Sequence, residues 1–463
     1  MHIYDSAKRK KVEFVPIKEK QVKIYVCGPT VYDDAHLGHA RSALAFDLLR
    51  RTFIELDYKV VFVKNFTDID DKIIKKMNQT GQTLEEITEF YIKRYKEEMS
   101  LLGISSADIE PKATDSIDEI VAFIKSLLSE DIAYKTSDSI YFDTSKDDKY
   151  LSLSHMKMDD TRARVEQNEE KRDQKDFALW KFSKEAEPSY KASFGDGRPG
   201  WHIECSAMIE KHMAYEGDFQ IDIHAGGADL LFPHHENEAC QTRCKSGQEL
   251  AKYWMHNGFV TINNEKMSKS LGNSFFLKDA LKKYDGEVLR FYLLGSHYRA
   301  NFNFSQADLL VSKKRLDKMY RLKKRVFEGK KSSTCKEFKK STLAALSEDL
   351  NISKALSLLD EMVAKANEKL DINPKDKATK FETNANLEWI ESILGIGYKN
   401  PYTYFQIGVT QEEKQEINNL INQRVEAKKE KDFKKADEIR DILTCRGIQL
   451  MDTANGTMWE KSQ

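Results

Sequence analysis

A strand, a helix and a second strand that follow one another within about 45 residues constrain the fold of this chain more than any other feature. Residues 22–27 predict a buried strand that Gly28-Pro29-Thr30 ends, and residues 38–55 predict a helix with an apolar side. Residues 58–63 predict the second strand. This order is the βαβ unit of a parallel sheet, and its crossover is almost always right-handed.

The alternation is interrupted and then resumes. Residues 84–130 have helical character, and the stretch up to about residue 200 changes to short strands such as 139–142 and a charged segment at 157–176. We expect this stretch to be an insertion between two halves of the sheet. A helix near 203–213 and a strand at 220–224 follow, and Pro233 can open a helix that runs to about residue 245.

The chain is mostly helical from about residue 305. Residues 313–331 hold ten Lys or Arg and only two acidic residues. A long charged helix is expected over about 411–444, and residues 448–459 are typical of a small hairpin with a type I′ turn at Asn455-Gly456.

Composition excludes several classes of protein. The 463 residues carry 74 Lys and Arg and 75 Asp and Glu, which is too balanced for a protein that coats nucleic acid without specificity. Six cysteines in so long a chain are too few for a disulfide scaffold. No stretch approaches the ~18 consecutive apolar residues of a membrane span, and the first residues lack the apolar core of a secretory signal. We therefore expect a cytoplasmic protein that does not contact a membrane.

Two short motifs could bind phosphate. His36-Leu37-Gly38-His39 lies where a helix begins, and Lys266-Met267-Ser268-Lys269-Ser270 supplies two lysines separated by small or flexible residues. Helix N-termini and paired cations both favour phosphate. Taken singly, the first is equally typical of two loop histidines or half a metal site, and the second of a solvated charged loop. No Gly-rich phosphate loop ending in Gly-Lys-Ser/Thr occurs, so ATP would have to bind through these two motifs together.

These motifs match the two hallmark motifs of the class I aminoacyl-tRNA synthetases, and other segments resemble the cysteinyl-tRNA synthetases within that class. The segments that carry this resemblance are Cys27-Gly28-Pro29-Thr30-Val31-Tyr32-Asp33, Asn65-Phe66-Thr67-Asp68-Ile69-Asp70-Asp71-Lys72-Ile73-Ile74, Gly200-Trp201-His202-Ile203-Glu204-Cys205-Ser206-Ala207-Met208 and Phe232-Pro233-His234-His235-Glu236-Asn237-Glu238. The resemblance extends from about residue 20 to Trp459. One departure is Leu37, where the family motif usually has Ile.

The resemblance implies an α/β fold: a Rossmann-like parallel-sheet catalytic domain with an insertion, then a mostly α-helical C-terminal half and a small α+β terminal module. The implied parts are 1–112, the first half of the catalytic domain; 113–195, a connective insertion; 196–248, the second half with zinc ligands; 249–310, a stem-contact region with the lysine loop; 311–404, a helical bundle that binds tRNA; and 405–463, an anticodon-recognition module.

A metal site can be assembled from distant segments. Cys27 ends a strand, Cys205 begins a helix, and His234 and Glu238 are four residues apart and therefore on one helical face. Two thiolates, an imidazole and a carboxylate suit Zn²⁺, and the family places its single zinc on these four matching positions. A local site of Cys240 and Cys244 with His234 or His235 is a rival interpretation, as is a purely structural zinc.

The resemblance implies that the zinc recognises the substrate by coordinating its sulfur. Shape selection supplies only ~1–3 kcal/mol for a difference of about a methylene, too little to separate cysteine from serine, whereas zinc holds a coordinating thiol as the thiolate. Gly28, Thr67 and Trp201 would then border the cysteine, and His224 and Asp229 would lie by the substrate or the adenosine. Trp201 could equally be a core residue, and Asp229 a helix cap.

The implied reaction is the ATP-dependent joining of L-cysteine to tRNA(Cys). His36 and His39 would hold the phosphates of ATP, Mg²⁺ would accompany it, and Lys266 and Lys269 would follow the departing pyrophosphate. The basic side of residues 313–331 would face tRNA phosphates, and Lys428, Asp437, Asp452 and Trp459 are candidate anticodon contacts. We expect a monomer. The alternatives are a ligase that joins activated cysteine to an amino-sugar, and a non-catalytic RNA-binding protein that kept the fold.

Overall fold

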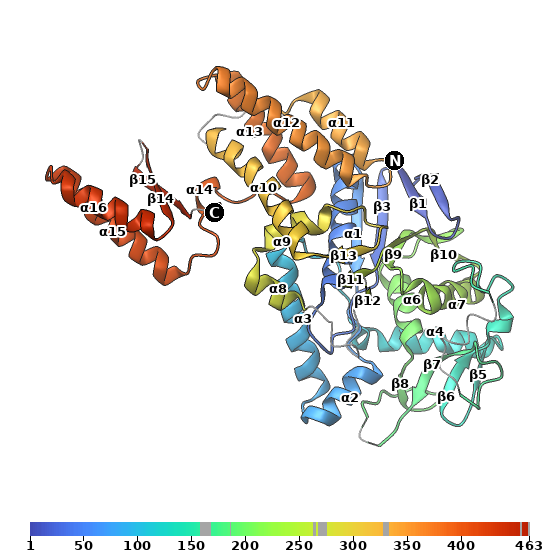
Figure 1. Ribbon diagram of the computed structural model, residues 1–463. Coiled ribbons are helices and arrows are strands. Elements are labelled where there is room, and N and C mark those ends of the chain that lie inside the picture. The colour runs from blue at the N-terminus through green and yellow to red at the C-terminus, as the bar shows by residue number, and fades with distance from the viewer. Residues whose placement is uncertain are drawn as a thin grey trace. The chain divides into compact units, whose positions relative to one another are not determined.

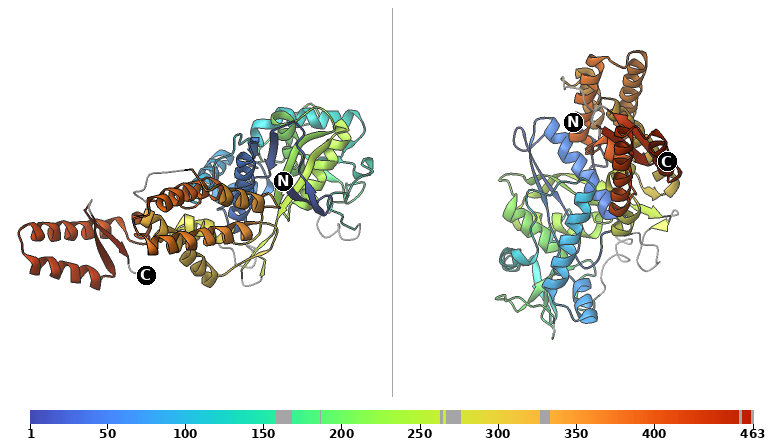
Figure 2. Two further views of the ribbon diagram at one scale, coloured as in Figure 1. Left: turned by 90° about the horizontal axis from the view of Figure 1, so that it is seen from above. Right: turned by 90° about the vertical axis from the view of Figure 1, so that its left-hand side faces the viewer.

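The computed structural model describes residues 1–157, 168–185, 187–262, 265–266, 276–326, 333–453 and 456–461. The chain divides into two compact units. The first comprises Met1–Ser312 with Lys340–Leu358, and the second comprises Lys313–Lys339 with Leu359–Gln463. Figures 1 and 2 show the chain from three directions. The six-part division expected from the sequence remains a prediction.

A four-stranded sheet in the order β10-β9-β3-β4, with all strands parallel, is the centre of the first unit. Its strands are β3 (Gln21–Val26), β4 (Lys59–Lys64), β9 (Phe219–Gly227) and β10 (Glu249–Asn257). The crossover from β3 to β4 contains α1 (Leu37–Glu55), and that from β9 to β10 contains α7 (Glu236–Ser246). Because these crossovers run in opposite directions along the sheet, right-handed connections put α1 and α7 on opposite faces. The expected Rossmann-like α/β fold is confirmed.

The helix α6 (Trp201–His212) shares a face of the sheet with α7 (Figure 1). Tyr25 and Val63, on neighbouring strands, pack there against Met208 and Ile209 of α6, and all four are buried. Cys205 belongs to the same apolar cluster. Packing of α6 on the sheet therefore brings Cys205 close to the end of β3, where Cys27 lies.

The residues between β4 and β9 include the expected insertion. Its antiparallel sheet has the order β5-β6-β7-β8, formed by β5 (Ala133–Lys135), β6 (Ser139–Phe142), β7 (Phe177–Phe182) and β8 (Gly197–Pro199). The helix α4 (Ile117–Ser129) packs on this sheet through Ile120, Phe123, Ile124 and Leu127. Helical sequence over 84–130 proves to be two helices, α3 (Leu84–Leu101) and α4, because Gly103 adopts a positive φ of 68° that ends the first.

Several further elements complete the first unit. The hairpin of β1 (His2–Asp5) and β2 (Lys10–Glu13), which the sequence did not predict, contacts β10. The sheet β12-β11-β13 combines β11 (Val260–Ile262), β12 (Glu265–Lys266) and β13 (Phe302–Phe304). The remaining α-helices that lie wholly or partly in this unit are α2 (Asp71–Thr80), α8 (Leu277–Lys283), α9 (Gly286–Leu294), α10 (Gln306–Val326), α11 (Lys336–Leu346) and α12 (Ile352–Ile372).

The second unit contains the greater part of α10 and α12, together with α13 (Lys377–Leu394), α14 (Pro401–Tyr404) and a terminal module. The single helix expected over 411–444 is wrong. The structure has α15 (Gln411–Lys429) and α16 (Phe433–Cys445), because Lys431 adopts a left-handed φ of 63° and Asp432 caps the second helix.

The terminal module has a core of its own. The strands β14 (Ile448–Thr453) and β15 (Gly456–Lys461) form the expected hairpin. Their residues Ile448 and Trp459 pack with Ile417, Ile421, Ile439 and Leu443 of α15 and α16. The side chain of Trp459 is therefore a core residue, only 3% exposed, and the expectation that it meets an anticodon base is wrong. No helix among the described residues is long and apolar enough to cross a membrane.

Candidate active site and metal cluster

A pocket of about 330 Å³ opens where the carboxyl ends of the parallel strands meet. Cys27 after β3, Lys64 at the end of β4, Gly227 at the end of β9 and Asn257 at the end of β10 all line it. This edge of an open α/β sheet is where such folds bind ligands. His36, His39, Gly28, Trp201 and Asp229, all singled out in the sequence, also line this pocket.

The two histidines at the start of α1 hold one another in a reciprocal cap. Nδ1 of His36 accepts a hydrogen bond from the backbone N–H of Gly38 at 3.1 Å, and Nδ1 of His39 accepts from the backbone N–H of His36 at 3.2 Å. The two rings stack with centroids 3.8 Å apart. A Cβ at position 38 would lie only 2.8 Å from Cε1 of His36, so this cap requires glycine there.

The cap determines the tautomers. Because Nδ1 of each ring accepts a hydrogen bond, each neutral ring carries its proton on Nε2. Both Nε2 atoms can then donate to an anionic oxygen beside the positive end of the α1 dipole. The spacing of His36 and His39 thus lets each histidine cap the helix N-terminus through its Nδ1.

The lysine motif is only partly within the described residues. Lys266 ends β12, where its backbone pairs with Thr261 of β11. Nothing is described of its side chain, and Lys269 lies outside the described residues.

The four expected metal ligands come together in the structure. Sγ of Cys27 lies 3.8 Å from Sγ of Cys205 and 3.7 Å from Oε1 of Glu238. Nε2 of His234 lies 3.7 Å from Sγ of Cys205 and 2.9 Å from Oε1 of Glu238. His234 lies in the π-helical turn Leu231–His235, which continues directly into α7, and Glu238 lies in the first turn of α7. Phe232 has extended backbone angles and Pro233 follows it, so the expected helix opened by Pro233 and running to about residue 245 agrees with the structure.

These separations fit a metal ion with tetrahedral coordination. Ligands at ~2.3 Å for sulfur and ~2.0 Å for nitrogen or oxygen stand ~3.3–3.8 Å apart on a tetrahedron. Three of the four distances lie in that range, and the fourth, 2.9 Å, is a hydrogen bond between His234 and Glu238. Cys205, His234 and Glu238 are buried, whereas Cys27 is half-buried and lines the pocket. The donor set therefore fits Zn²⁺, with one side toward the pocket.

Electrostatics favour a cation in this cluster. Burial acts to lower the pKa of His234 and to raise the pKa of Glu238, but their mutual attraction prevails. The pKa of His234 rises to about 10, and the pKa of Glu238 lies well below its ordinary value. Burial also acts to raise the pKa of Cys205, yet hydrogen bonds with Cys27 and His234 lower it to about 6. Burial, together with Cys205 and Glu238, raises the pKa of Cys27 well above its ordinary value, so a bound cation would displace protons from Cys27 and His234.

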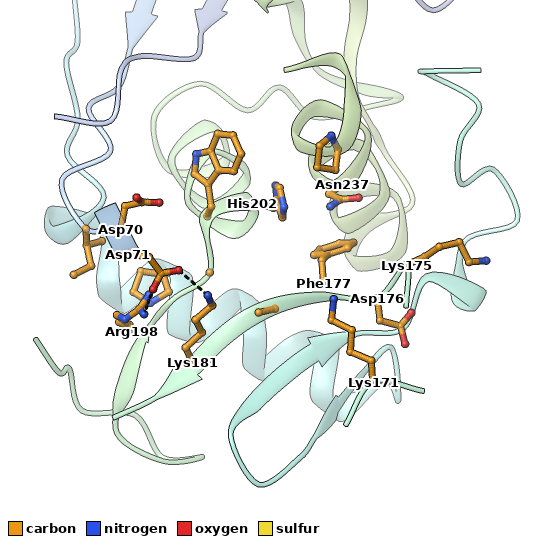
Figure 3. A pocket seen from close by; sticks show the side chains of 16 residues that line it. Asp70, Asp71, Lys171, Lys175, Asp176, Phe177, Lys181, Arg198, His202 and Asn237 are labelled. Carbon is orange, nitrogen blue, oxygen red and sulfur yellow. Dashed lines mark hydrogen bonds and ion pairs between the residues drawn. The ribbon is translucent and has the colours of Figure 1, made fainter. Parts of the chain in front are cut away.

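Trp201 and His202, the first two residues of α6, orient His234 from the other side. The indole of Trp201 stacks on the ring of His234 with centroids 4.1 Å apart. Nδ1 of His202 lies 3.0 Å from Nδ1 of His234, which leaves Nε2 of His234 toward the cluster. A second pocket of about 250 Å³ adjoins these residues, and Figure 3 shows its side chains, with Asp71 between Arg198 and Lys181.

The other expected substrate residues lie in different surroundings. Gly28 accommodates a close backbone approach, because a Cβ there would lie 1.5 Å from the carbonyl oxygen of Asn65. Thr67 is buried and exchanges backbone hydrogen bonds with Pro29 and Val31. His224 is fully buried, and its Nε2 lies 2.6 Å from Oε2 of Glu238, so it contacts the metal cluster directly.

From the sequence, His235 was considered only as a ligand of the rival site with Cys240 and Cys244, whereas the structure places it at the main cluster. Its Nε2 lies 3.3 Å from Sγ of Cys27. The adjacent pair His234-His235 was the available signal, but sequence spacing does not say where each ring points. The rival site is not supported: Cys240 is packed in the core of the insertion, and among the described residues neither Cys240 nor Cys244 belongs to a group of possible ligands.

Comparison with known proteins gives a consistent result over the whole chain. The family model "tRNA synthetases class I (C) catalytic domain" matches residues 13–314, and the DALR domain model matches residues 343–399. The chain is 63% identical to a cysteine–tRNA ligase of Aliarcobacter butzleri, over all of this chain and 99% of that protein. It is 62% identical to the cysteine–tRNA ligase of Nitratiruptor sp., over the full length of both.

Solved structures share the fold at low sequence identity. Mycobacterium tuberculosis methionyl-tRNA synthetase in complex with methionyl-adenylate matches with a TM-score of 0.60 and 12% identity, covering 81% of this chain and 92% of that one. Agrobacterium radiobacter LeuRS, in a ternary complex with tRNA and LeuAMS, matches with a TM-score of 0.61 and 11% identity, covering 83% and 85%.

Proposed function

The chain belongs to the cysteine–tRNA ligases, ATP-dependent enzymes of the class I aminoacyl-tRNA synthetase family, and we propose that it works through cysteinyl-adenylate with a zinc ion that reads the substrate thiol. In the first step the carboxylate of cysteine attacks the α-phosphate of ATP and releases pyrophosphate. In the second step a ribose hydroxyl of the terminal adenosine of tRNA(Cys), the 2′-OH in this class, attacks the adenylate and releases AMP.

The start of α1 binds the phosphates of ATP in this proposal. Nε2–H of His36 and of His39 donates to phosphate oxygens, at the positive end of the α1 dipole. Lys266 and Lys269 neutralise the charge that develops on pyrophosphate, and Mg²⁺ accompanies the nucleotide. Asp229 and Gly227, which line the same pocket at the end of β9, lie on the adenosine side.

One zinc ion would be held by the side chains of Cys27, Cys205, His234 and Glu238. When bound there, zinc would keep the thiol of the substrate as a thiolate, which serine cannot imitate because its hydroxyl is far less acidic. Cys27 is the ligand that lines the pocket, so the amino acid approaches from that side. Trp201 also lines the pocket and covers His234, and the backbone at Gly28 forms the adjacent wall. These residues position the cysteine and exclude water.

The exposed face of α10 binds tRNA in this proposal. Lys314, Lys318 and Arg321 are exposed at helical positions i, i+4 and i+7 and therefore form one stripe. Other cations of the helix are used within the second unit, since Lys313 pairs with Asp317 and Arg315 with Asp360.

The enzyme acts as a cytoplasmic monomer in this proposal.

The amino-sugar alternative is less well supported. A ligase of that kind would lack the C-terminal module, whereas residues 411–459 of this chain form a terminal module with its own core. A transfer assay with tRNA and an amino-sugar as competing acceptors distinguishes the two. We expect transfer to tRNA only.

The observation that carries this proposal is that the four ligand atoms lie within 4.8 Å of one another beside the pocket, with three of their separations at 3.7–3.8 Å. Cys205→Ser and Glu238→Gln are expected to lose zinc and to lower cysteine-dependent ATP–pyrophosphate exchange by more than ~100-fold, with ATP binding retained. Cys244→Ser is the matched control, because Cys244 lies on the same helix as Glu238 outside the cluster. Equal loss of ATP binding and cysteine activation in the first two variants would mean that the metal is structural.

A further inference from the structure

The metal cluster contains a second set of four ligands that shares two members with the first. Cys27, His224, His235 and Glu238 offer ligand atoms that all lie within 4.8 Å of one another. The first set has Cys205 and His234 in place of His224 and His235, with Cys27 and Glu238 common to both. His224, His235 and Glu238 have no exposed surface.

The two shared residues face both sets. Oε1 of Glu238 lies 2.9 Å from Nε2 of His234 in the first set, and Oε2 lies 2.6 Å from Nε2 of His224 in the second. Sγ of Cys27 lies 3.8 Å from Sγ of Cys205 and 3.3 Å from Nε2 of His235. The carboxylate of Glu238 thus has one oxygen toward each set, and the thiol of Cys27 lies between the two sets. Two metal ions ~3.5–4 Å apart can share ligands that are arranged in this way.

The second set is held in place by groups behind it. Nδ1 of His235 lies 2.8 Å from Nε2 of His256, whose Nδ1 lies 2.8 Å from Oγ of Ser6. Metal-binding histidines are commonly oriented in this way by a partner on the other ring nitrogen. The ring of His224 stacks on the indole of Trp254 with centroids 4.7 Å apart, which limits its rotation.

We propose that Cys27, His224, His235 and Glu238 form a second metal position, which takes a borderline-soft divalent cation such as Zn²⁺ when that ion is in excess. One thiolate, two imidazoles and one carboxylate are ligands that zinc accepts. The second position binds its cation less tightly than the first, because that cation would lie close to another ion of the same sign.

A functional consequence follows from the shared ligands and rests on the proposed role of the first zinc. An ion in the second position takes electron density from Cys27 and Glu238, which the first ion also needs. Excess zinc is therefore expected to inhibit cysteine activation reversibly, and a chelator that removes only the weaker ion should restore it.

The test is a metal titration of the full chain stripped of metal, with Zn²⁺ followed by metal analysis and Co²⁺ followed by its absorption spectrum. We expect two equivalents in the wild-type protein, one tight and one weaker. His235→Gln should keep the tight equivalent and lose the weaker one. His212→Gln, at the end of α6 and outside both sets, is the control for adventitious histidine sites and should keep both.

A second variant tests the position without the first. Cys205→Ser combined with His234→Gln should still bind one Co²⁺, with the weaker thiolate charge-transfer band of a single sulfur ligand, and circular dichroism verifies that this variant is folded. One equivalent in the wild-type protein, or a second equivalent that survives His235→Gln, overturns this proposal and leaves the first site standing. The absence of any tight equivalent counts against both proposals.

Discussion

The indole of Trp201 lies flat on the imidazole of His234, with ring centroids 4.1 Å apart and planes inclined by 16°. Trp201 is the first residue of α6, and its side chain is 37% exposed. It lines both the pocket at the carboxyl ends of the parallel strands and the smaller pocket beside it. The same side chain thus covers a metal ligand on one face and borders the expected substrate position. Its replacement should affect cysteine more than ATP.

We predict that Trp201→Ala raises the KM for cysteine by about tenfold, since an aromatic contact contributes ~0.5–1.5 kcal/mol beyond its buried area. Trp201→Phe keeps a ring on His234 and should retain most of the affinity. ATP–pyrophosphate exchange at saturating ATP, together with metal analysis, measures this effect. A variant that loses its zinc would show instead that Trp201 protects the metal.

The carboxylate of Asp71 connects α2 to the insertion, through Lys181 of β7 at 2.8 Å and through Arg198 of β8 (Figure 3). Partial burial acts to raise the pKa of Asp71, but the hydrogen bonds and charges of Lys181 and Arg198 outweigh it and hold the pKa below its ordinary value. A carboxyl whose pKa is lowered by folding stabilises the protein above its ordinary pKa and loses that contribution as the pH falls through the lowered value.

We therefore predict that Asp71→Asn loosens the insertion at neutral pH, with faster hydrogen exchange in residues 177–182. The change in unfolding free energy should be small, about 0.5–1 kcal/mol, because the carboxylate is largely exposed. The difference from wild type should be complete above about pH 4 and vanish at lower pH as the wild-type carboxyl is protonated. Asp173→Asn is the control, since among the described residues the ion pair of Asp173 is with Lys175, within the insertion. A difference that persists at the lowest pH would contradict the ion-pair explanation.

The stripe Lys314, Lys318 and Arg321 on α10 gives a prediction about RNA. Changing all three to Ala should weaken tRNA binding. It should also reduce the slope of log affinity against log salt by up to about 2, because this is the contribution expected from three phosphate contacts with single-stranded or irregular RNA. Cysteine-dependent ATP–pyrophosphate exchange should be unchanged. A variant with Lys10, Lys59 and Lys125 changed to Ala has the same net charge and serves as the control. An unchanged salt slope would place the RNA elsewhere.

The core of the terminal module depends on Trp459. Its indole packs among Ile417, Ile421, Ile439 and Leu443, and Nε1–H donates to Oδ1 of Asn418 at 3.1 Å. Trp459→Ala should cost about 3–5 kcal/mol and unfold a module this small. We predict loss of tRNA charging with normal amino-acid activation, measured with the same exchange assay and limited proteolysis. Asn418→Ala removes only the hydrogen bond and should keep most of the charging activity.

Local sequence was a good guide where local physics decides the outcome. The strand-helix-strand pattern over 22–63 predicted the parallel sheet, because alternation of apolar segments with helical spacing leaves few other folds. The hairpin at the C-terminus was also predicted correctly, although its register pairs Thr453 with Gly456, the first residue of β15, and Asn455 of the expected turn lies outside the described residues. The break between α15 and α16 was missed, because Lys431 is neither Gly nor Pro and only Asp432, as a helix cap, indicated a new start.

For the site, motif spacing brought Cys27, Cys205, His234 and Glu238 into one hypothesis, yet it could not say what surrounds them. His224 was expected beside the substrate or the adenosine and is found to contact Glu238, while His235 was considered only for the rival site with Cys240 and Cys244 and is found to contact Cys27. These partners are separated by up to 208 residues, so no local pattern relates them.

The sequence by itself determined the elements, the order of strands and helices along the chain, and the chemical kinds of ligand available. The packing of α6 and α7 on one face of the sheet decided which rings and thiols meet, because contacts between distant segments depend on how buried side chains fill the space between layers. The orientation of His234 under Trp201 and the sharing of Glu238 follow from that packing, whereas the tautomers of His36 and His39 follow from their local cap.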